Sequence, residues 1–251
     1  MMLTAENYFS QEAERLYFGS SQFKSFMECE AAAMAKIRGE YVEEPTTALL
    51  VGSYVDAHFE GTLDIFKAKH PEIFTRNGEL KSEYRHAEYI IDRVEKDEMF
   101  MRYMRGGHQV IKTGELFGVP WKIKIDSYHK GRAIIDLKVM RSFEPIWKEG
   151  QGKIPFVEAW GYDIQGAIYQ AIEGNGLPFF IAGVTKEKPE PDLAIISIPQ
   201  EDLNVAREIV KAHIERFDSV KKGLAEPVRC EKCDYCKRTK KLSQIVSYKE
   251  L

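Results

Sequence analysis

This sequence of 251 residues lacks the features that mark membrane, secreted and low-complexity chains. No apolar run approaches the roughly 20 residues of a membrane-spanning helix. Residues 1–17 hold three glutamates and no apolar segment of the kind found in signal peptides. Internal repeats are missing, and 44% of the residues are hydrophobic, enough for a sizeable core. We therefore expect a soluble, cytoplasmic protein with no membrane partner.

An excess of positive charge is lacking as well. Lys and Arg total 36 against 39 Asp and Glu, which gives a formal net charge of -3. By the usual criterion of a strongly basic domain, this composition argues against a nucleic-acid partner. Net charge, however, averages over a surface, whereas DNA responds to local potential. Residues 229–241 hold six basic and two acidic residues, a local excess of four positive charges.

Cysteine is rare, and four cysteines do not suggest a disulfide scaffold in an intracellular chain of this size. Three of them, Cys230, Cys233 and Cys236, lie together near the end, and Cys29 lies about 200 residues earlier. The two-residue spacers are familiar from zinc and iron-sulfur ligation. Metal binding and reduced, unligated thiols are both open interpretations.

The spacing of apolar residues predicts helices at both ends of the chain and strands between them. Ser20 or Ser21 is a candidate N-cap for the first helix. Such a succession of helices and strand pairs indicates an α/β (α+β) fold around a small central sheet. The predicted helices cover residues 20–38, 48–60, 79–105, 157–173 and 201–223, and the predicted strands cover 119–126, 132–139, 179–185 and 192–198.

The strand over 132–139 carries two charges among apolar residues. Side chains alternate along a strand, so Asp136 and Lys138 share one face and Leu137 lies on the other. Charges on a central strand are costly to bury unless they are paired, metal-bound or solvated in a cleft. Asp126 ends the preceding strand, and the turn between the strands can bring it beside Asp136. Two carboxylates and an ammonium group would then share one site.

Such a site suits metal-assisted hydrolysis of phosphodiesters. Carboxylate oxygens hold Mg²⁺ or Mn²⁺, and the metal acidifies water and screens the phosphate charge. Lys138 would stabilise or orient the attacking hydroxide, and the backbone carbonyl of Leu137 is a further candidate ligand. An ordinary Asp/Lys pair on an edge strand is the alternative, because D-x-K triplets are common.

Four motifs occur in a characteristic order along the chain. They are Gly52-x-x-x-Asp56, Asp126, Asp136-Leu137-Lys138 and Gln165-x-x-x-Tyr169. With these motifs the chain resembles the PD-(D/E)xK nuclease superfamily, most closely its RecB-like branch and the phage RecE- and lambda-type exonucleases. The resemblance runs from about residue 20 to 241 and implies a restriction-endonuclease-like mixed sheet flanked by helices.

The resemblance implies one domain over residues 1–251. Its parts are a helical N-terminal region to about residue 108, a catalytic sheet core over about 109–200, and a C-terminal helix with the cysteine cluster over about 201–251.

The resemblance also assigns roles at the site. Asp56, Asp126, Asp136 and the Leu137 carbonyl would hold Mg²⁺ or Mn²⁺, with Lys138 and Gln165 completing the catalytic set. Many relatives have a histidine where this chain has Asp56, but the lambda-type branch has an acid there.

Several other residues near these motifs have expected positions as well. His58 is two residues out of register with the family histidine, so we expect it at the helix surface. Glu60, one turn from Asp56, is a candidate support for it. Glu115 is expected to be an exposed turn acid. Tyr169 would lie near the DNA, although packing in the core is an equal alternative.

The expected activity is that of a Mg²⁺-dependent DNA exonuclease that acts on duplex ends, 5′ to 3′, in phage-type recombination. The polarity, a phage single-strand annealing partner and a homo-oligomeric ring come from the resemblance alone. The helix start at Ser20 to Lys24 is a candidate 5′-phosphate pocket, because its backbone N-H groups are free. The alternatives are an endonuclease or single-strand nuclease of the same fold, and a non-catalytic DNA-binding module.

For the cysteines, the resemblance implies an iron-sulfur cluster. Several RecB-like nucleases clamp their chain ends with one N-terminal and three C-terminal cysteines around a [4Fe-4S] cluster. We expect such a cluster, with Zn²⁺ as the second possibility, as a structural staple formed by Cys29, Cys230, Cys233 and Cys236. The spacing between Cys233 and Cys236 is shorter than in those relatives, which usually have more than two residues before the final cysteine.

Overall fold

A five-stranded mixed sheet forms the centre of the protein in a computed structural model that describes residues 1–242, 244–245 and 247. Its strand order is β1-β2-β3-β6-β7. β3 and β6 are parallel, and the other neighbours are antiparallel. The strands are β1 (Gly107–Leu116), β2 (Val119–His129), β3 (Ala133–Met140), β6 (Phe179–Thr185) and β7 (Leu193–Ser197).

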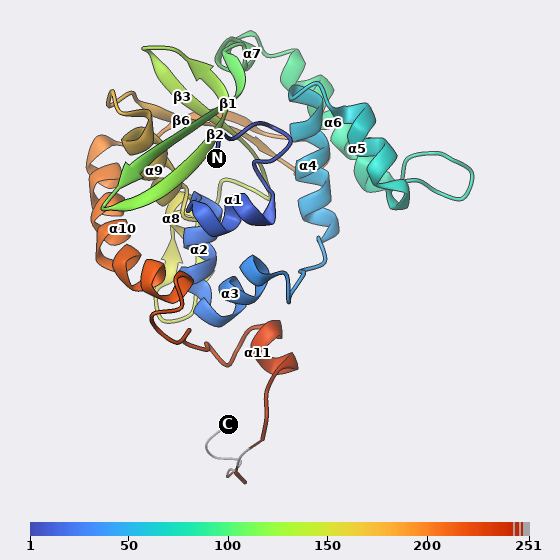
Figure 1. Ribbon diagram of the computed structural model, residues 1–251. Coiled ribbons are helices and arrows are strands. Elements are labelled where there is room, and N and C mark those ends of the chain that lie inside the picture. The colour runs from blue at the N-terminus through green and yellow to red at the C-terminus, as the bar shows by residue number, and fades with distance from the viewer. Residues whose placement is uncertain (243, 246, 248–251) are drawn as a thin grey trace.

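Helices cover both faces of this sheet (Figure 1). One face packs against α2 (Ser20–Glu28), α9 (Tyr162–Glu173) and α10 (Gln200–Lys221). The other packs against α4 (Thr47–Phe59), α6 (Ser82–Glu95) and α7 (Glu98–Met104).

The two faces carry separate apolar cores. Along β3, Ile134 belongs to the first core, and Ile135 and Leu137 belong to the second. The alternation expected for this strand is therefore correct, and so is the α/β fold class.

Three predicted helices are each two helices. The one over 20–38 is divided at Cys29, whose extended backbone (φ -164°, ψ 109°) ends α2 and precedes α3 (Glu30–Arg38). The one over 79–105 is divided before α7, which Asp97 caps by accepting from Phe100 N. The one over 157–173 is divided at Gly161, where a positive φ of 61° separates α8 (Phe156–Ala159) from α9.

The predicted N-cap of α2 is wrong, and one strand of the sheet was not predicted. Gly19 is the N-cap of α2, and Ser20 is the first helical residue, so neither serine caps it. Strand β1 has no counterpart in the sequence prediction, because its polar and apolar residues do not alternate cleanly. Glu115 therefore lies in a strand, opposite Pro120, although it is exposed as expected.

The remaining elements are short: α1 (Gln11–Leu16), α5 (Leu63–Lys69), η1 (Pro71–Ile73), the hairpin of β4 (Ile146–Lys148) and β5 (Gly152–Ile154), and α11 (Asp234–Arg238). Within the described part of the chain, no helix is both long and apolar enough to cross a membrane.

Candidate active site

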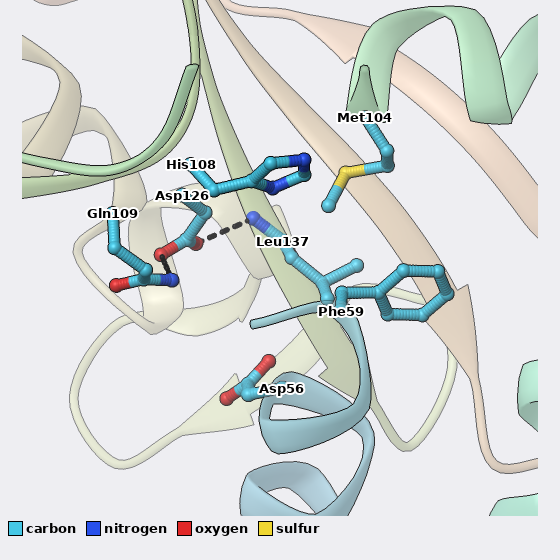
Figure 2. Close-up of a pocket in the computed structure, with 7 residues that line it drawn as sticks. All are labelled: Asp56, Phe59, Met104, His108, Gln109, Asp126 and Leu137. Atoms are coloured by element: carbon cyan, nitrogen blue, oxygen red, sulfur yellow. Dashed lines mark hydrogen bonds between the residues drawn. The ribbon is translucent and has the colours of Figure 1, made fainter. Parts of the chain in front are cut away.

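The site forms where β2 and β3 stop pairing. Their ladder covers only residues 127–129 of β2 and 133–135 of β3, and both strands continue beyond it. Just past the last pair, Asp126 Oδ2 accepts a hydrogen bond of 2.8 Å from the backbone N-H of Leu137. A buried N-H without a partner would be costly, so the carboxylate replaces the missing ladder bond. Figure 2 shows this contact and its neighbours.

Asp136 is the most deeply buried acid of the site, with 2% of its surface exposed. Its Oδ1 accepts a hydrogen bond of 2.6 Å from Gln165 Nε2 on α9. Its Oδ2 is buried and forms an ion pair with Lys138, and it accepts no other hydrogen bond from the described residues. Lys138 Nζ also donates to the Leu137 carbonyl over 3.3 Å. One oxygen of Asp136 thus keeps lone pairs for a cation.

Asp56 brings a third carboxylate from α4, on the other side of the sheet. It lines a small pocket together with Asp126, Leu137 and other residues of α4, α7 and β1 (Figure 2). Its carboxylate accepts no hydrogen bond from any described side chain or backbone group. The three acids therefore come from α4, β2 and β3. The Asp56 carboxylate is positioned by the packing of α4 and not by a hydrogen bond of its own to another described residue.

The charges at the site perturb one another. Burial raises the pKa of Asp56 to about 7; the carboxylates of Asp136 and Glu60 also raise it, and Lys138 opposes them. Burial and the charge of Asp136 raise the pKa of Asp126 well above its usual range. Burial alone would lower the pKa of Lys138, but Asp136 and Asp126 outweigh it and hold that pKa above its ordinary value.

These residues fit a divalent cation. Converging carboxylates repel each other, and a hard cation with oxygen ligands relieves that repulsion. Asp136 Oδ2, buried without a hydrogen-bond partner among the described residues, and the carboxylate of Asp56 would provide ligand atoms for such a cation. The structure thus brings together the acids and the lysine that the sequence singles out.

Lys24 of α2 also lies at this site. Its Nζ donates to the backbone carbonyl of Trp160 over 3.1 Å and lies 5.6 Å from the centre of the Tyr162 ring. Lys138 Nζ lies 5.5 Å from the centre of the same ring, so both ammonium groups are close to one tyrosine. Burial, together with the charge of Lys138, lowers the pKa of Lys24 to about 8. Ser20, the other predicted phosphate-binding residue, is buried one turn earlier.

Gln165 and Tyr169, which lie one turn apart on α9, have different roles. Gln165 is buried and holds Asp136, as expected. Tyr169 is 6% exposed, packs on the Phe179 ring and donates to the backbone carbonyl of Lys124. Its burial favours the packing alternative over contact with DNA.

The lesser candidates lie near the positions expected for them. Glu60 forms an ion pair of 3.1 Å with Lys124 and acts on Asp56 through its charge. His58 pairs with Glu95 over 2.8 Å, away from the acids. Gly52 lies one turn before Asp56, and a Cβ there would meet no atom within 4 Å, so packing does not require glycine at this position.

Gln109 is a site residue that the sequence does not reveal. It has a positive φ of 52° on β1, a strained conformation for a residue with a side chain. Its Nε2 contacts Asp126 Oδ1 over 3.4 Å, and its Oε1 is buried without a hydrogen-bond partner among the described residues. No sequence signal identifies it, because the strand that carries it was not predicted.

The four cysteines also converge. Cys29 lies between α2 and α3, and the other three lie in the segment around α11, next to α3 (Figure 1). All four are free thiols, and their sulfur atoms lie within 4.8 Å of one another.

Comparison with known proteins agrees with this architecture. A family model described as a PDDEXK-like domain of unknown function (DUF3799) matches residues 19–239. The chain belongs to this PDDEXK-like family. The superfamily and the restriction-endonuclease-like fold predicted from the four motifs are therefore confirmed.

Solved structures extend the comparison for this PDDEXK-like protein. A crystal structure from Eubacterium rectale, described as a "Putative exonuclease", is 50% identical, covers 100% of this chain and 98% of its own, and superposes with a TM-score of 0.96. The structure of SSO0001 aligns over 86% of this chain and 91% of its own at 14% identity, and its TM-score of 0.32 is too low to establish a shared fold. No curated protein matches significantly.

Replacing Asp56 by Asn should stabilise the protein in the absence of divalent cations. The pKa of Asp56 is raised to about 7 in the fold, so its ionised form destabilises the native state at neutral pH. We expect a gain of about 1 to 3 kcal/mol at pH 8 that shrinks as the pH falls toward 4. Urea unfolding in EDTA measures it.

The exposed Asp92 provides the control, since Asp92→Asn should leave stability within about 0.5 kcal/mol. Addition of Mg²⁺ should stabilise the wild type more than Asp56→Asn. A variant that is less stable than the wild type in EDTA would contradict this account of Asp56.

Replacing Gln109 by Gly should show the backbone strain at this residue separately from its role in positioning Asp126. Glycine adopts a positive φ without cost, so stability should hold or rise by about 1 kcal/mol. Asp126 would lose its amide partner, and we expect the Mg²⁺ concentration for half-maximal thermal stabilisation to rise about 10-fold. An unchanged Mg²⁺ midpoint would show that Gln109 does not position the site.

Proposed function

We propose that this protein is a Mg²⁺-dependent DNA exonuclease, with Mn²⁺ as an alternative metal. One observation carries the proposal: Asp126, Asp136 and the ammonium of Lys138 gather where β2 and β3 separate, and Asp56 lines the same pocket as Asp126. A module that only bound DNA would gain nothing from converging carboxylates, because they repel phosphate. The arrangement therefore favours hydrolysis over simple binding.

The three carboxylates would hold the metal, with the Leu137 carbonyl as a further ligand. When bound, the ion screens the charge of the scissile phosphate and acidifies water. The chain's own residues supply the remaining functions. Gln165 holds Asp136 in place through its amide, and Gln109 does the same for Asp126.

Lys138 would act on the nucleophile. Its ammonium is oriented by Asp136 and by the Leu137 carbonyl, so it is held at the acids rather than free in solvent. A fixed positive charge there stabilises the negative charge that develops on the attacking oxygen and on the phosphate. In the metal-free protein, Asp136 and Asp126 hold the pKa of Lys138 above its ordinary value, so the side chain is cationic at neutral pH.

End recognition is the next part of the proposal. Lys24, in α2, and Lys138 both approach the Tyr162 ring, at 5.6 and 5.5 Å from its centre. A 5′-terminal phosphate bound by Lys24 and the first turn of α2 would place the adjoining phosphodiester near the acids. This geometry supports 5′ to 3′ digestion of duplex ends, and the Eubacterium rectale relative described as an exonuclease supports an end-directed activity.

The cellular role follows from the resemblance to phage exonucleases. We propose cytoplasmic action in phage-type recombination, with DNA as the partner, a single-strand annealing protein downstream and a homo-oligomeric ring as the processive form. The basic residues after α10 would provide part of the DNA contact.

Lys138→Met should reduce degradation of linear duplex DNA by at least about 100-fold, because the ammonium beside the reacting phosphate is lost. Asp136→Asn should do the same through loss of a metal ligand. The assay is digestion of end-labelled duplex with and without Mg²⁺.

Lys112→Met is the matched control for Lys138→Met. The side chain of Lys112 is 27% exposed and pairs with the buried Glu173, much as the 23% exposed Lys138 pairs with Asp136. It should keep near wild-type activity. Equal losses in both variants would assign the effect to folding rather than chemistry.

The same preparation distinguishes the alternatives. Cleavage of closed-circular duplex would identify an endonuclease, and preference for single strands would identify a single-strand nuclease. DNA binding without any Mg²⁺-dependent cleavage would indicate a non-catalytic DNA-binding module.

Lys24→Met should slow digestion from 5′-phosphorylated ends about 10-fold and change digestion from 5′-hydroxyl ends little. In the wild type, the preference for 5′-phosphate should fall as the pH rises past about 8, where the ammonium loses its proton. Equal rates on both kinds of end, at pH 7 and in both proteins, would remove Lys24 from end recognition.

A further inference from the structure

We propose that Cys29, Cys230, Cys233 and Cys236 bind a single tetrahedral Zn²⁺ ion, and that they do not hold the [4Fe-4S] cluster that the resemblance implies. The inference is independent of the proposed nuclease activity. It rests on the distances between the four sulfur atoms and on the groups around them.

The sulfur atoms are too close together for a cubane cluster. Cys29 Sγ lies 3.6 Å from Cys236 Sγ, Cys230 Sγ lies 4.0 Å from Cys236 Sγ, and the four ligand atoms lie within 4.8 Å of one another. Zn-S bonds of about 2.3 Å in a tetrahedron place the sulfurs about 3.8 Å apart. In a [4Fe-4S] cluster each thiolate binds a different iron, which places the sulfurs roughly 6 Å apart.

Backbone groups support thiolates in this arrangement. The N-H of Cys233 donates to Cys230 Sγ over 3.3 Å, and the N-H of Cys236 donates to Cys233 Sγ over 3.5 Å. Each bond stabilises negative charge on sulfur, which a metal-bound thiolate needs. Glu231, with a positive φ of 58°, turns the chain between the first two ligands.

Positive charge lies next to this site. Four thiolates on one Zn²⁺ leave a net charge of about -2. Arg229 donates to the carbonyl of Cys236 over 2.7 Å, and its guanidinium lies 6.0 Å from the centre of the Tyr235 ring. Arg229 therefore offsets part of the charge of the site.

The ion would join the break between α2 and α3 to the end of the chain. Protein contacts already bring the two together: Glu30 accepts two hydrogen bonds from Arg216, of 3.1 and 2.8 Å, and one of 2.7 Å from Val228 N. Cys29 immediately precedes these contacts, so its thiol is placed before any metal binds. Loss of the ion should release the segment after residue 228 while the sheet stays folded.

Metal analysis of the full chain tests the proposal. Protein purified under anaerobic conditions should contain zinc at a ratio near one per chain, with no acid-labile sulfide and no visible absorption. It should retain that zinc against a competing colorimetric chelator. After replacement by Co²⁺, the spectrum should show the thiolate charge-transfer and tetrahedral d-d bands of a four-sulfur site.

Variants define the ligands. Cys233→Ser should weaken metal retention at least 10-fold and shift the Co²⁺ spectrum, and Lys237→Gln, in the adjoining helix α11, should change neither. Iron and sulfide in a 4:4 ratio would overturn the proposal in favour of the cluster. Metal-free protein with four reactive thiols and an unchanged melting temperature would overturn it in favour of unligated cysteines. The wild-type metal content decides between these outcomes even if a variant fails to fold.

Discussion

The candidate active site depends on one hydrogen bond, from the backbone N-H of Leu137 to Asp126 Oδ2. Between paired strands that N-H would bond to a carbonyl of the neighbouring strand, and the gap that holds the acids would be closed. With a side chain as acceptor, β2 and β3 separate without leaving the N-H unsatisfied. Helices on the two faces of the sheet then reach the gap, α4 with Asp56 and α9 with Gln165.

Several negative charges lie between β2 and β3, beyond their last paired residues, where little water reaches them. Three acids and one lysine share this region, and burial raises the pKa of Asp56 to about 7. Such a group lowers the stability of the metal-free protein, so the two apolar cores that flank the sheet must hold the acids against their repulsion. The fold, and not the acids themselves, keeps these side chains together.

The second cluster differs in chemistry and in purpose. Oxygen ligands at the sheet suit an exchangeable hard cation, whereas four thiolates suit a tightly held structural ion. The two clusters meet through α2. This helix ends just before Cys29 and carries Lys24, which approaches the same Tyr162 ring as Lys138. A metal ion bound at Cys29, next to the end of α2, would therefore also limit how far Lys24 can move from the active site.

Local patterns in the sequence were sufficient for the strand alternation that separates Asp136 from Leu137 and for the hairpin that brings Asp126 close. They were sufficient because a period of two and a short turn involve neighbours in the chain. The order of the four motifs further implied the superfamily and the acid from α4. The breaks at Cys29 and Gly161, the strand β1 and the role of Gln109 were decided by tertiary structure. Each depends on contacts between distant segments: Gln109 acquires its role only because β1 pairs with β2 beside Asp126. The same holds for the cysteines. Their spacing suggested a metal, but only folding sets the distances between sulfur atoms that distinguish one ion from a cluster.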